Sequence, residues 1–363
     1  MADDNWHPLH DAPAFPPERV GPLADRLGRL LKTKNDMLLF QTEAVVALEA
    51  VAASIARPGL TALNIVTSPF GAWFGTWLKR GGADVVTLAA EPAQPIAAEA
   101  VEAAFEAHPA VRAVVLCHAE SANGVLNPLE AIIAAARARG IVTVVDAVAS
   151  VGGHALDVDA LGIDVAVIGP QKALAGPAGL SALSVSGAAW GLVEAGGLRT
   201  STLSLLDRRD WLQAGRGALP GTAAPLEFFA LEAALDRFEA EGLEAVIARH
   251  ARAAAATRDG LLALGAELWV ETGRGSHLVT TAKIPDGVDI AALLAAAEPL
   301  GMDLSAGIGP GAERLVRLNH TGRRARFETV LGAVLAFGLA LRACGAPADL
   351  AAAGAAVAAR YAG

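Results

Sequence analysis

At 363 residues the chain exceeds the ~250 to 300 residues at which a single hydrophobic core stops growing, so we expect two domains. Its 29 basic and 38 acidic residues give a net charge of −9 without blocks of one sign, which excludes a nucleic-acid footprint or a polybasic membrane patch. We therefore expect small-molecule partners, with no nucleic acid, membrane or metal.

Targeting features are also missing from the sequence. No uninterrupted apolar stretch reaches the ~18 residues of a membrane-spanning helix, and the N-terminus lacks the basic-then-apolar pattern of a signal peptide. Only two cysteines occur, Cys117 and Cys344, far apart in the sequence. The pattern favours a reducing cytoplasm without a disulfide framework, and Cys117, inside an apolar run, is expected to be a plain buried thiol.

The predicted elements begin with an irregular segment. Residues 1–22 carry five prolines and little periodicity, which predicts an N-terminal arm. From Glu43 to Ala56 the apolar spacing predicts a helix that ends before Pro58-Gly59. Short apolar runs then alternate with helical segments, a pattern typical of a mostly parallel sheet covered by helices on both faces. The expected strands are 62–67, 84–88, 111–117, 141–146, 164–168 and 180–185, with helices near 70–80, 97–107 and 128–139.

The pattern changes after about residue 225. Two long helices, 225–241 and 243–264, precede strand-like pieces at 267–270, 277–283 and 314–318 and then further helices, including the alanine-rich tail 350–360. This order predicts a smaller α+β domain. We expect an arm over 1–22, a large α/β domain over 23–235 that carries the site, and a small C-terminal domain over 236–363.

Two charged residues stand at the carboxyl ends of predicted strands. Asp146 ends one apolar run, and Lys172 follows another in Gly169-Pro170-Gln171-Lys172. Ligands of such sheets bind outside the carboxyl ends of the strands. A lysine amine that forms a Schiff base and an anion that keeps a ring nitrogen protonated are what a pyridine-aldehyde cofactor requires.

Four segments give the chain, from residue 43 to about 322, a family resemblance. They are Glu120-Ser121-Ala122-Asn123-Gly124-Val125-Leu126-Asn127-Pro128, Val145-Asp146-Ala147-Val148-Ala149-Ser150-Val151-Gly152-Gly153, Gly169-Pro170-Gln171-Lys172-Ala173-Leu174 and Arg317-Leu318-Asn319-His320-Thr321-Gly322. In this order and spacing they resemble the class V, fold type I aminotransferases, in particular the alanine-glyoxylate aminotransferase group. The resemblance implies the fold type I architecture, pyridoxal 5'-phosphate as the cofactor, and a homodimer or homotetramer.

The resemblance also implies a role for individual residues. Lys172 would be the catalytic Schiff-base lysine and proton relay, Asp146 would pair with the ring nitrogen, and Arg317 would clamp the substrate carboxylate. The neighbouring Arg314, Arg323 and Arg324 leave a shifted assignment of that clamp open. The remaining cofactor contacts implied are Phe70 and Val148 on the two faces of the ring, Ser121 beside its substituents, Gln171 at the phosphate end, and Thr222 reaching the partner subunit's phosphate.

The sequence departs from the family where the phosphate is held. Most members begin their first helix with a glycine-, serine- or threonine-rich turn, whereas this chain has Gln41-Thr42-Glu43. Beside a phosphate dianion, the Glu43 carboxylate would cost several kcal/mol at about 4 Å. The same acid is found in the pyridoxamine-pyruvate aminotransferase branch, which takes unphosphorylated pyridoxamine as a substrate. Leu219 stands where the family usually carries a tyrosine, which removes one phosphate contact. Two differences from that branch, Ile308 for a second arginine and phenylalanine rather than tyrosine at Phe70, leave the substrate open.

Four functions are therefore compatible with the sequence. The first is an aminotransferase that moves an amino group to a small 2-oxo acid, pyruvate or glyoxylate, with free pyridoxamine and pyridoxal as possible substrates. The second is the same reaction with a conventional, tightly held pyridoxal phosphate. A class V lyase is a further alternative, although a desulfurase would need a mobile cysteine and Cys344 lies in a predicted helix; the last is an inactive family member.

Overall fold

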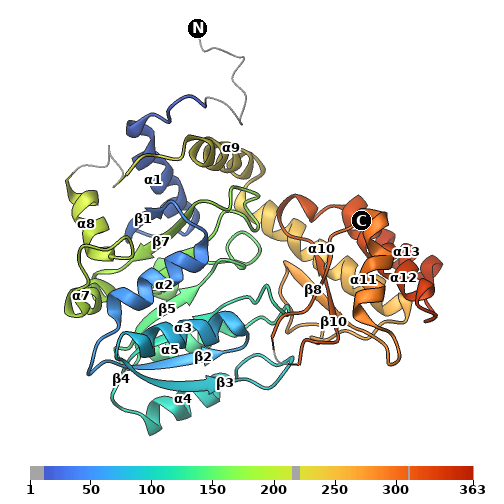
Figure 1. Ribbon diagram of the computed structural model, residues 1–363, viewed down its shortest axis with the longest axis horizontal. Helices are drawn as coiled ribbons and strands as arrows, with labels where there is room; N and C mark the ends of the chain where they lie inside the picture. The colour runs from blue at the N-terminus through green and yellow to red at the C-terminus, as the bar shows by residue number, and fades with distance from the viewer. Residues whose placement is uncertain (1–11, 215–220, 310, 363) are drawn as a thin grey trace.

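The computed structural model describes residues 12–214, 221–309 and 311–362. Figure 1 shows two adjoining units, a larger one from the N-terminal two thirds of the chain and a smaller one from the C-terminal third. Within the described ranges, no helix is long and apolar enough to cross a membrane. Leu219 lies outside them.

The larger unit is built on a seven-stranded sheet in the order β1-β7-β6-β5-β4-β2-β3. Strands β2 to β6 run parallel to one another, and β7 runs antiparallel to both β6 and β1. This confirms the mostly parallel sheet. The strands are β1 Asp36–Phe40, β2 Thr61–Val66, β3 Asp84–Ala89, β4 Val111–Cys117, β5 Val142–Asp146, β6 Val165–Ile168 and β7 Ser181–Val185.

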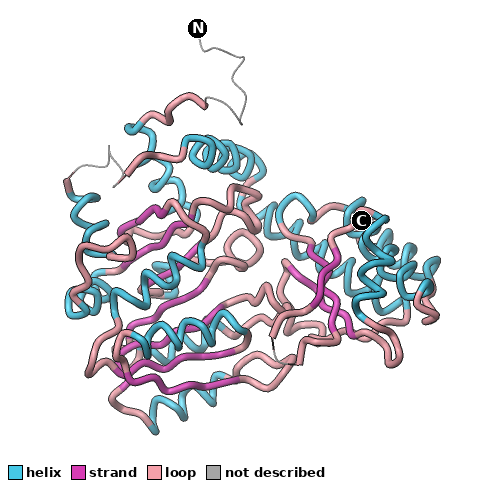
Figure 2. The backbone as a smooth tube through the Cα atoms, in the orientation of Figure 1, coloured by secondary structure: helices cyan, strands magenta, loops and turns pink. Residues whose placement is uncertain are grey.

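Helices cover both faces of this sheet (Figure 2). Successive side chains of a strand point to opposite faces, so in β4 Val114 and Leu116 join one core while Ala113 and Val115 join the other. This double burial explains why the strands are almost wholly apolar. On one face lie α1 Val20–Leu30, α4 Ala98–Ala107, α5 Leu129–Arg137, the short α6 Val158–Leu161 and α9 Pro225–Glu241; on the other lie α2 Ala44–Ile55, α3 Pro69–Arg80, α7 Gly187–Gly196 and α8 Leu205–Gln213.

The smaller unit has a three-stranded antiparallel sheet in the order β8-β10-β9. The predicted strand 267–270 is wrong, because this segment makes only a single bridge, between Leu268 and Ala282. The third strand of the sheet is β9, a short strand not predicted, which pairs with β10 at the edge opposite this segment. The elements are α10 Leu243–Leu264, β8 Val279–Lys283, α11 Ile290–Ala297 with a 3-10 turn at Glu298–Leu300, β9 Leu304–Ala306, β10 Leu315–Asn319, a 3-10 turn at Gly322–Arg324, α12 Phe327–Ala343 and α13 Leu350–Ala359.

The chain passes from one core to the other at Gly242. Helix α9 contributes Leu235 and Phe238 to the core of the large sheet, whereas α10 contributes Leu261 to the core of the small one. Gly242 joins them at φ 86°, a conformation that favours glycine. The expected boundary after residue 235 falls inside α9, so we propose to place it at Gly242.

The N-terminal arm was expected to be irregular up to residue 22, and here the prediction is wrong. A 3-10 turn spans Pro17–Arg19 and α1 begins at Val20. Proline is tolerated in a first helical turn because its missing N–H would be unpaired there in any case. Phe15 is buried and stacks on Phe228 of α9, with ring centroids 5.1 Å apart. Residues 1–11 lie outside the described part.

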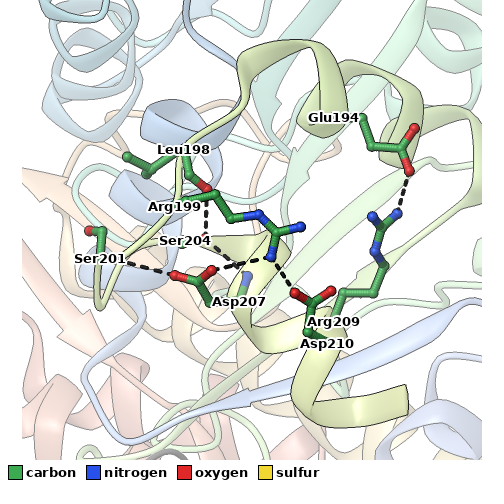
Figure 3. Close-up of polar contacts among 8 residues, drawn as sticks. All are labelled: Glu194, Leu198, Arg199, Ser201, Ser204, Asp207, Arg209 and Asp210. Carbon is green, nitrogen blue, oxygen red and sulfur yellow. Dashed lines mark hydrogen bonds and ion pairs between the residues drawn. The ribbon is translucent and has the colours of Figure 1, made fainter. Parts of the chain in front are cut away.

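The connection between α7 and α8 is held by the side chain of Ser204 (Figure 3). Ser204 Oγ donates to Leu198 O at 2.7 Å and accepts from Asp207 N at 3.0 Å, and the residue is fully buried. Around it, Arg199 pairs with Asp207 and Asp210 on the surface.

We expect Ser204→Ala to lower the free energy of unfolding by about 1 to 2 kcal/mol, because it removes an N-cap and leaves buried polar groups unpaired. Arg199→Ala, which removes only exposed ion pairs, should have a smaller effect. Denaturant unfolding of the two variants makes the comparison, and an equal or larger loss in Arg199→Ala would contradict it.

Five histidines meet where the two domains touch. His118 and His154 come from the large domain, and His250, His277 and His320 from the small one. The rings of His154 and His277 stack with centroids 4.2 Å apart, and His154 Nε2 accepts from the backbone N–H of His277 at 3.1 Å. The five histidines therefore form a largely buried cluster at the junction of the two domains.

This cluster predicts loss of stability in acid. Burial lowers the pKa of His154 to about 2, of His320 to about 3, and of His118 and His250 to about 4. Below about pH 6.5 these histidines become protonated in the unfolded chain while they stay neutral in the folded chain. The free energy of unfolding therefore falls by up to about 1.4 kcal/mol per histidine per pH unit. Unfolding measured between pH 7 and pH 5 should show a steep fall, and replacing the exposed His108 by glutamine should leave that slope unchanged.

Candidate active site

The site lies at the carboxyl ends of three neighbouring strands. Cys117 at the end of β4 is in register with Asp146 at the end of β5, and β6 leads through Ile168 into the turn that carries Lys172. Parallel pairing thus brings together residues that are far apart in the sequence. This is the edge at which a ligand was expected.

Six of the predicted site residues line one pocket at this edge: Glu43, Phe70, Ser121, Asp146, Val148 and Lys172. Each has its own structural support. Phe70 sits in the first turn of α3, where Ser68 Oγ accepts its backbone N–H at 3.2 Å, and its ring packs edge-on against Trp73. Val148 is buried, and its backbone N–H donates to Asp146 Oδ1 at 3.0 Å.

The two charged residues at the centre of the pocket are both shifted toward their neutral forms. Burial raises the pKa of Asp146 to about 7, against the Val148 N–H and the Lys172 charge, which lower it. Burial also lowers the pKa of Lys172, against the Glu43 and Asp146 carboxylates, which raise it. A protonated ring nitrogen beside Asp146 would supply the cation that this buried carboxylate lacks, so the pocket fits a pyridine cofactor.

The Glu43 carboxylate lies at the N-terminus of α2, and each of its two oxygens accepts a hydrogen bond. Oε2 accepts from Val45 N at 2.7 Å, and Oε1 accepts from Gln171 Nε2 at 2.6 Å. The N-terminal end of a helix is a natural position for an anion. In this chain the anion there is the protein's own carboxylate, and Gln171 is engaged with it.

A second pocket of about 250 Å³ adjoins the first and shares Ser121, Ala149 and Lys172 with it. Arg317 lines this second pocket from β10, and its Nη1 donates to Ser121 O at 2.9 Å. Lys172 therefore stands between the ring pocket and an arginine. The other residues of this pocket are Leu278, Val279, Asp303, Ser305, Asn319 and Thr321.

The other arginines considered for the clamp lie elsewhere. Arg314 donates to Ile284 O and Pro285 O, and Arg324 pairs with Asp303 at 2.6 Å. Arg323 lines a separate surface pocket. Of these four, only Arg317 lines a pocket that also contains Lys172.

Three predicted residues, Gln171, Thr42 and Thr222, line neither pocket. Thr222 is exposed, and its carbonyl accepts from Gln41 Nε2 at 3.1 Å. Thr42 Oγ1 is buried and has no hydrogen-bond partner in the part of the chain that the structure describes. Cys344, the candidate for a desulfurase, caps α12 against the core of the small domain.

The structure also adds residues that sequence reasoning missed. Glu120 and Cys117 line the ring pocket, and both are buried. The signal for Glu120 was its place next to Ser121 in the first family-like segment. Cys117 was correctly expected to be buried, but strand pairing, which the sequence did not reveal, places it beside Asp146.

Comparison with known proteins agrees with this geometry. The model of the family "Aminotransferase class-V" matches residues 24–307. The chain is 35% identical to a pyridoxamine–pyruvate transaminase of Mesorhizobium japonicum, over 89% of this chain and 83% of that protein. The crystal structure of a pyridoxamine-pyruvate aminotransferase from Mesorhizobium loti has a TM-score of 0.90 and 32% identity, over 95% of this chain and 89% of that one.

A structure of an alanine–glyoxylate aminotransferase from Nostoc sp. has a TM-score of 0.83 at 27% identity, over 91% of this chain and 90% of that one. The family matches more than half of the chain, and the fold type I architecture is shared along almost its whole length. The family implies dependence on pyridoxal phosphate chemistry. This chain belongs to the class V aminotransferases.

Proposed function

We propose that this aminotransferase moves an amino group to a small 2-oxo acid, pyruvate or glyoxylate, and that its amino donor is unphosphorylated pyridoxamine. The observation that carries the second part is Glu43. Its carboxylate occupies the helix N-terminus, and its two oxygens are bonded to Val45 N and Gln171 Nε2. A phosphate dianion there would be repelled by this carboxylate, and Val45 N and Gln171 Nε2 would not be free to donate to it. Together these effects would cost several kcal/mol.

The relatives support the same substrate. The Mesorhizobium relatives are named for pyridoxamine and pyruvate. Other relatives, such as the marmoset alanine–glyoxylate aminotransferase, are named for glyoxylate. Both acceptors are small 2-oxo acids, and a pocket of about 250 Å³ that contains Arg317 suits a short carboxylate of this kind.

A bound pyridine-aldehyde ring supplies the electron sink for this chemistry. Lys172 Nζ, whose pKa burial lowers, would provide the amine that holds the ring aldehyde and would move the proton at the substrate α-carbon. Asp146 would hold a proton on the ring nitrogen, and Phe70 and Val148, which line the same pocket, would hold the ring. Arg317 orients the carboxylate, and Ser121 lies where the two pockets join.

The alternative is a conventional enzyme that holds pyridoxal 5'-phosphate tightly. Thr42 Oγ1 favours it, since this buried hydroxyl beside Glu43 has no partner among the described residues. The exposed Thr222 favours it too, if the chain forms a homodimer in which this threonine reaches the partner's phosphate. We propose that dimer for either version, and a cytoplasmic enzyme, in keeping with the two free cysteines.

The deciding experiment offers the protein pyruvate or glyoxylate with either pyridoxamine or its 5'-phosphate and follows formation of the aldehyde. We expect turnover with free pyridoxamine and little with the phosphate. Protein that is purified with a phosphate-bearing yellow chromophore, and that uses an amino acid donor instead, would replace this proposal by the conventional alternative.

Glu43→Ser tests the residue that carries the proposal. Removing the carboxylate frees Val45 N and Gln171 Nε2, so we expect affinity for pyridoxal phosphate to rise at least about tenfold relative to pyridoxal, the equivalent of about 1.4 kcal/mol. Equilibrium titration of the apoprotein by absorbance measures the ratio. Glu49→Ser removes the same charge from the same helix outside the pocket and should not change it.

A further inference from the structure

A buried carboxyl group that the proposed function does not use lies in the ring pocket. Glu120 is 1% exposed and lines this pocket together with Cys117, Asp146 and Lys172. Its Oε1 accepts a hydrogen bond of 2.6 Å from Thr67 Oγ1. Its Oε2 is buried and has no hydrogen-bond partner in the described part of the chain.

A chain of hydrogen bonds holds the first oxygen in place. Asn127 Nδ2 donates to Thr67 Oγ1 at 2.9 Å and to Cys117 O at 2.8 Å. Asn127 Oδ1 accepts from Ile96 N at 3.0 Å, which fixes the orientation of the amide. The Thr67 hydroxyl therefore gives its proton to Glu120, and Oε2 is left as the uncommitted atom of the carboxyl group.

The two buried acids of the pocket, Asp146 and Glu120, differ in the groups that surround them. Asp146 accepts the Val148 N–H and feels the positive charge of Lys172. Glu120 is surrounded by the hydroxyls of Ser68 and Thr67 and by the thiol of Cys117. An ionised carboxylate without a cation is expensive to bury, whereas a protonated one carries no charge to desolvate.

The direction of the pKa shifts agrees with this geometry. Burial raises the pKa of Glu120, against the nearby hydroxyls of Ser68 and Thr67, which lower it. A negative charge on Glu120 would in turn raise the pKa of Asp146. Burial raises the pKa of the Cys117 thiol well above its ordinary value, so Cys117 stays neutral. The remaining titratable groups of this pocket are Glu43 and Lys172.

We propose that Glu120 is a positioning residue that keeps its proton in the working site, so that Asp146 is the ionised carboxylate beside the ring nitrogen. Two buried acids in one pocket do not both ionise readily, and the proton goes to the one without a cation. The proposal rests on the proposed function only in assigning the ring nitrogen to Asp146.

Infrared spectroscopy of the apoprotein tests the protonation directly. Asp146→Asn serves as the background, because Asp146 itself is only partly ionised near pH 7 without the ring. We expect a protonated-carboxyl stretching band at neutral pH in Asp146→Asn that disappears when Glu120→Gln is added. Absence of the band from the background protein would overturn the proposal, and so would its persistence after the second change.

A second measurement uses the loaded protein and follows the visible absorbance of the lysine-bound cofactor against pH. Glu120→Gln replaces a neutral acid by a neutral amide that can still accept from Thr67, so the midpoint should not move. A downward shift of about one unit would show that a negative charge had been removed, and would refute the proposal. Glu43→Gln is the positive control, because the Glu43 carboxylate raises the pKa of Lys172 and its loss should lower the midpoint.

The infrared measurement tests the protonation of Glu120 independently of the proposed substrate. The infrared band does not depend on the amino donor or on a phosphate, so the choice of substrate can prove wrong while the band behaves as expected. Conversely, turnover of pyridoxamine with no protonated-carboxyl band would leave the function standing and remove the role of Glu120.

Discussion

Lys172→Ala is expected to reduce amino transfer by at least about 10³-fold, because it removes the amine of the Schiff base and the group that moves the α-carbon proton; base catalysis alone contributes ~10² to 10⁴. The variant should also lose the absorbance of a lysine-bound cofactor. Both are measured on purified protein with pyridoxamine and pyruvate.

The matched control is Lys79→Ala, which removes an exposed lysine near the end of α3. It should retain both turnover and absorbance. If Lys172→Ala kept the absorbance and turned over at the rate of the control, the assignment of the catalytic lysine would be wrong, even though Lys172 lies beside Asp146 in the pocket.

The second large effect is expected for Arg317→Ala. A charge-assisted hydrogen bond contributes about 1.5 to 3 kcal/mol, so kcat/KM for the 2-oxo acid should fall by about 10- to 100-fold. The loss should appear mainly in KM, because a carboxylate clamp binds the ground state and the transition state alike. Steady-state kinetics with pyruvate varied at fixed donor gives both constants.

Arg314→Ala is the control, because it removes another arginine from the same segment of the chain. Arg314 lies three residues before Arg317, but its guanidinium donates to Ile284 O and Pro285 O, away from the pocket that contains Lys172. Its replacement should leave KM for pyruvate unchanged. A larger effect in Arg314→Ala than in Arg317→Ala would restore the shifted assignment.

The helices and strands around the site were largely predictable, because each one has a local signal. The helix after Glu43 has an N-cap and a proline-glycine stop, and its observed span of Ala44–Ile55 confirms the prediction. In contrast, β1 was missed, because Asp36–Phe40 is short, apolar and free of β-branched residues. Its conformation is determined by antiparallel pairing with β7, which lies far along the chain.

The site divides in the same way. Lys172, Asp146 and Arg317 could be selected from motifs, since each belongs to a segment with a characteristic order of residues. Glu120 could not be assigned a role in this way, because its significance depends on an oxygen left unpaired by Thr67 and on Asp146 sharing its pocket. Burial and pairing across strands are properties of the folded chain.

The family, the aminotransfer chemistry and the unusual acid at the phosphate end of the site could all be recognised from the amino-acid sequence. These follow from residue types at fixed spacing, which sequence patterns record. The folded chain was needed to show that Glu43 is bonded through both oxygens to Val45 and Gln171, and which of the four arginines shares a pocket with Lys172. It was also needed to show that a second buried acid, Glu120, lies in the pocket of Asp146. The physical reason is that desolvation and hydrogen-bond partners set the charge of a side chain, and both depend on residues brought together from distant parts of the chain.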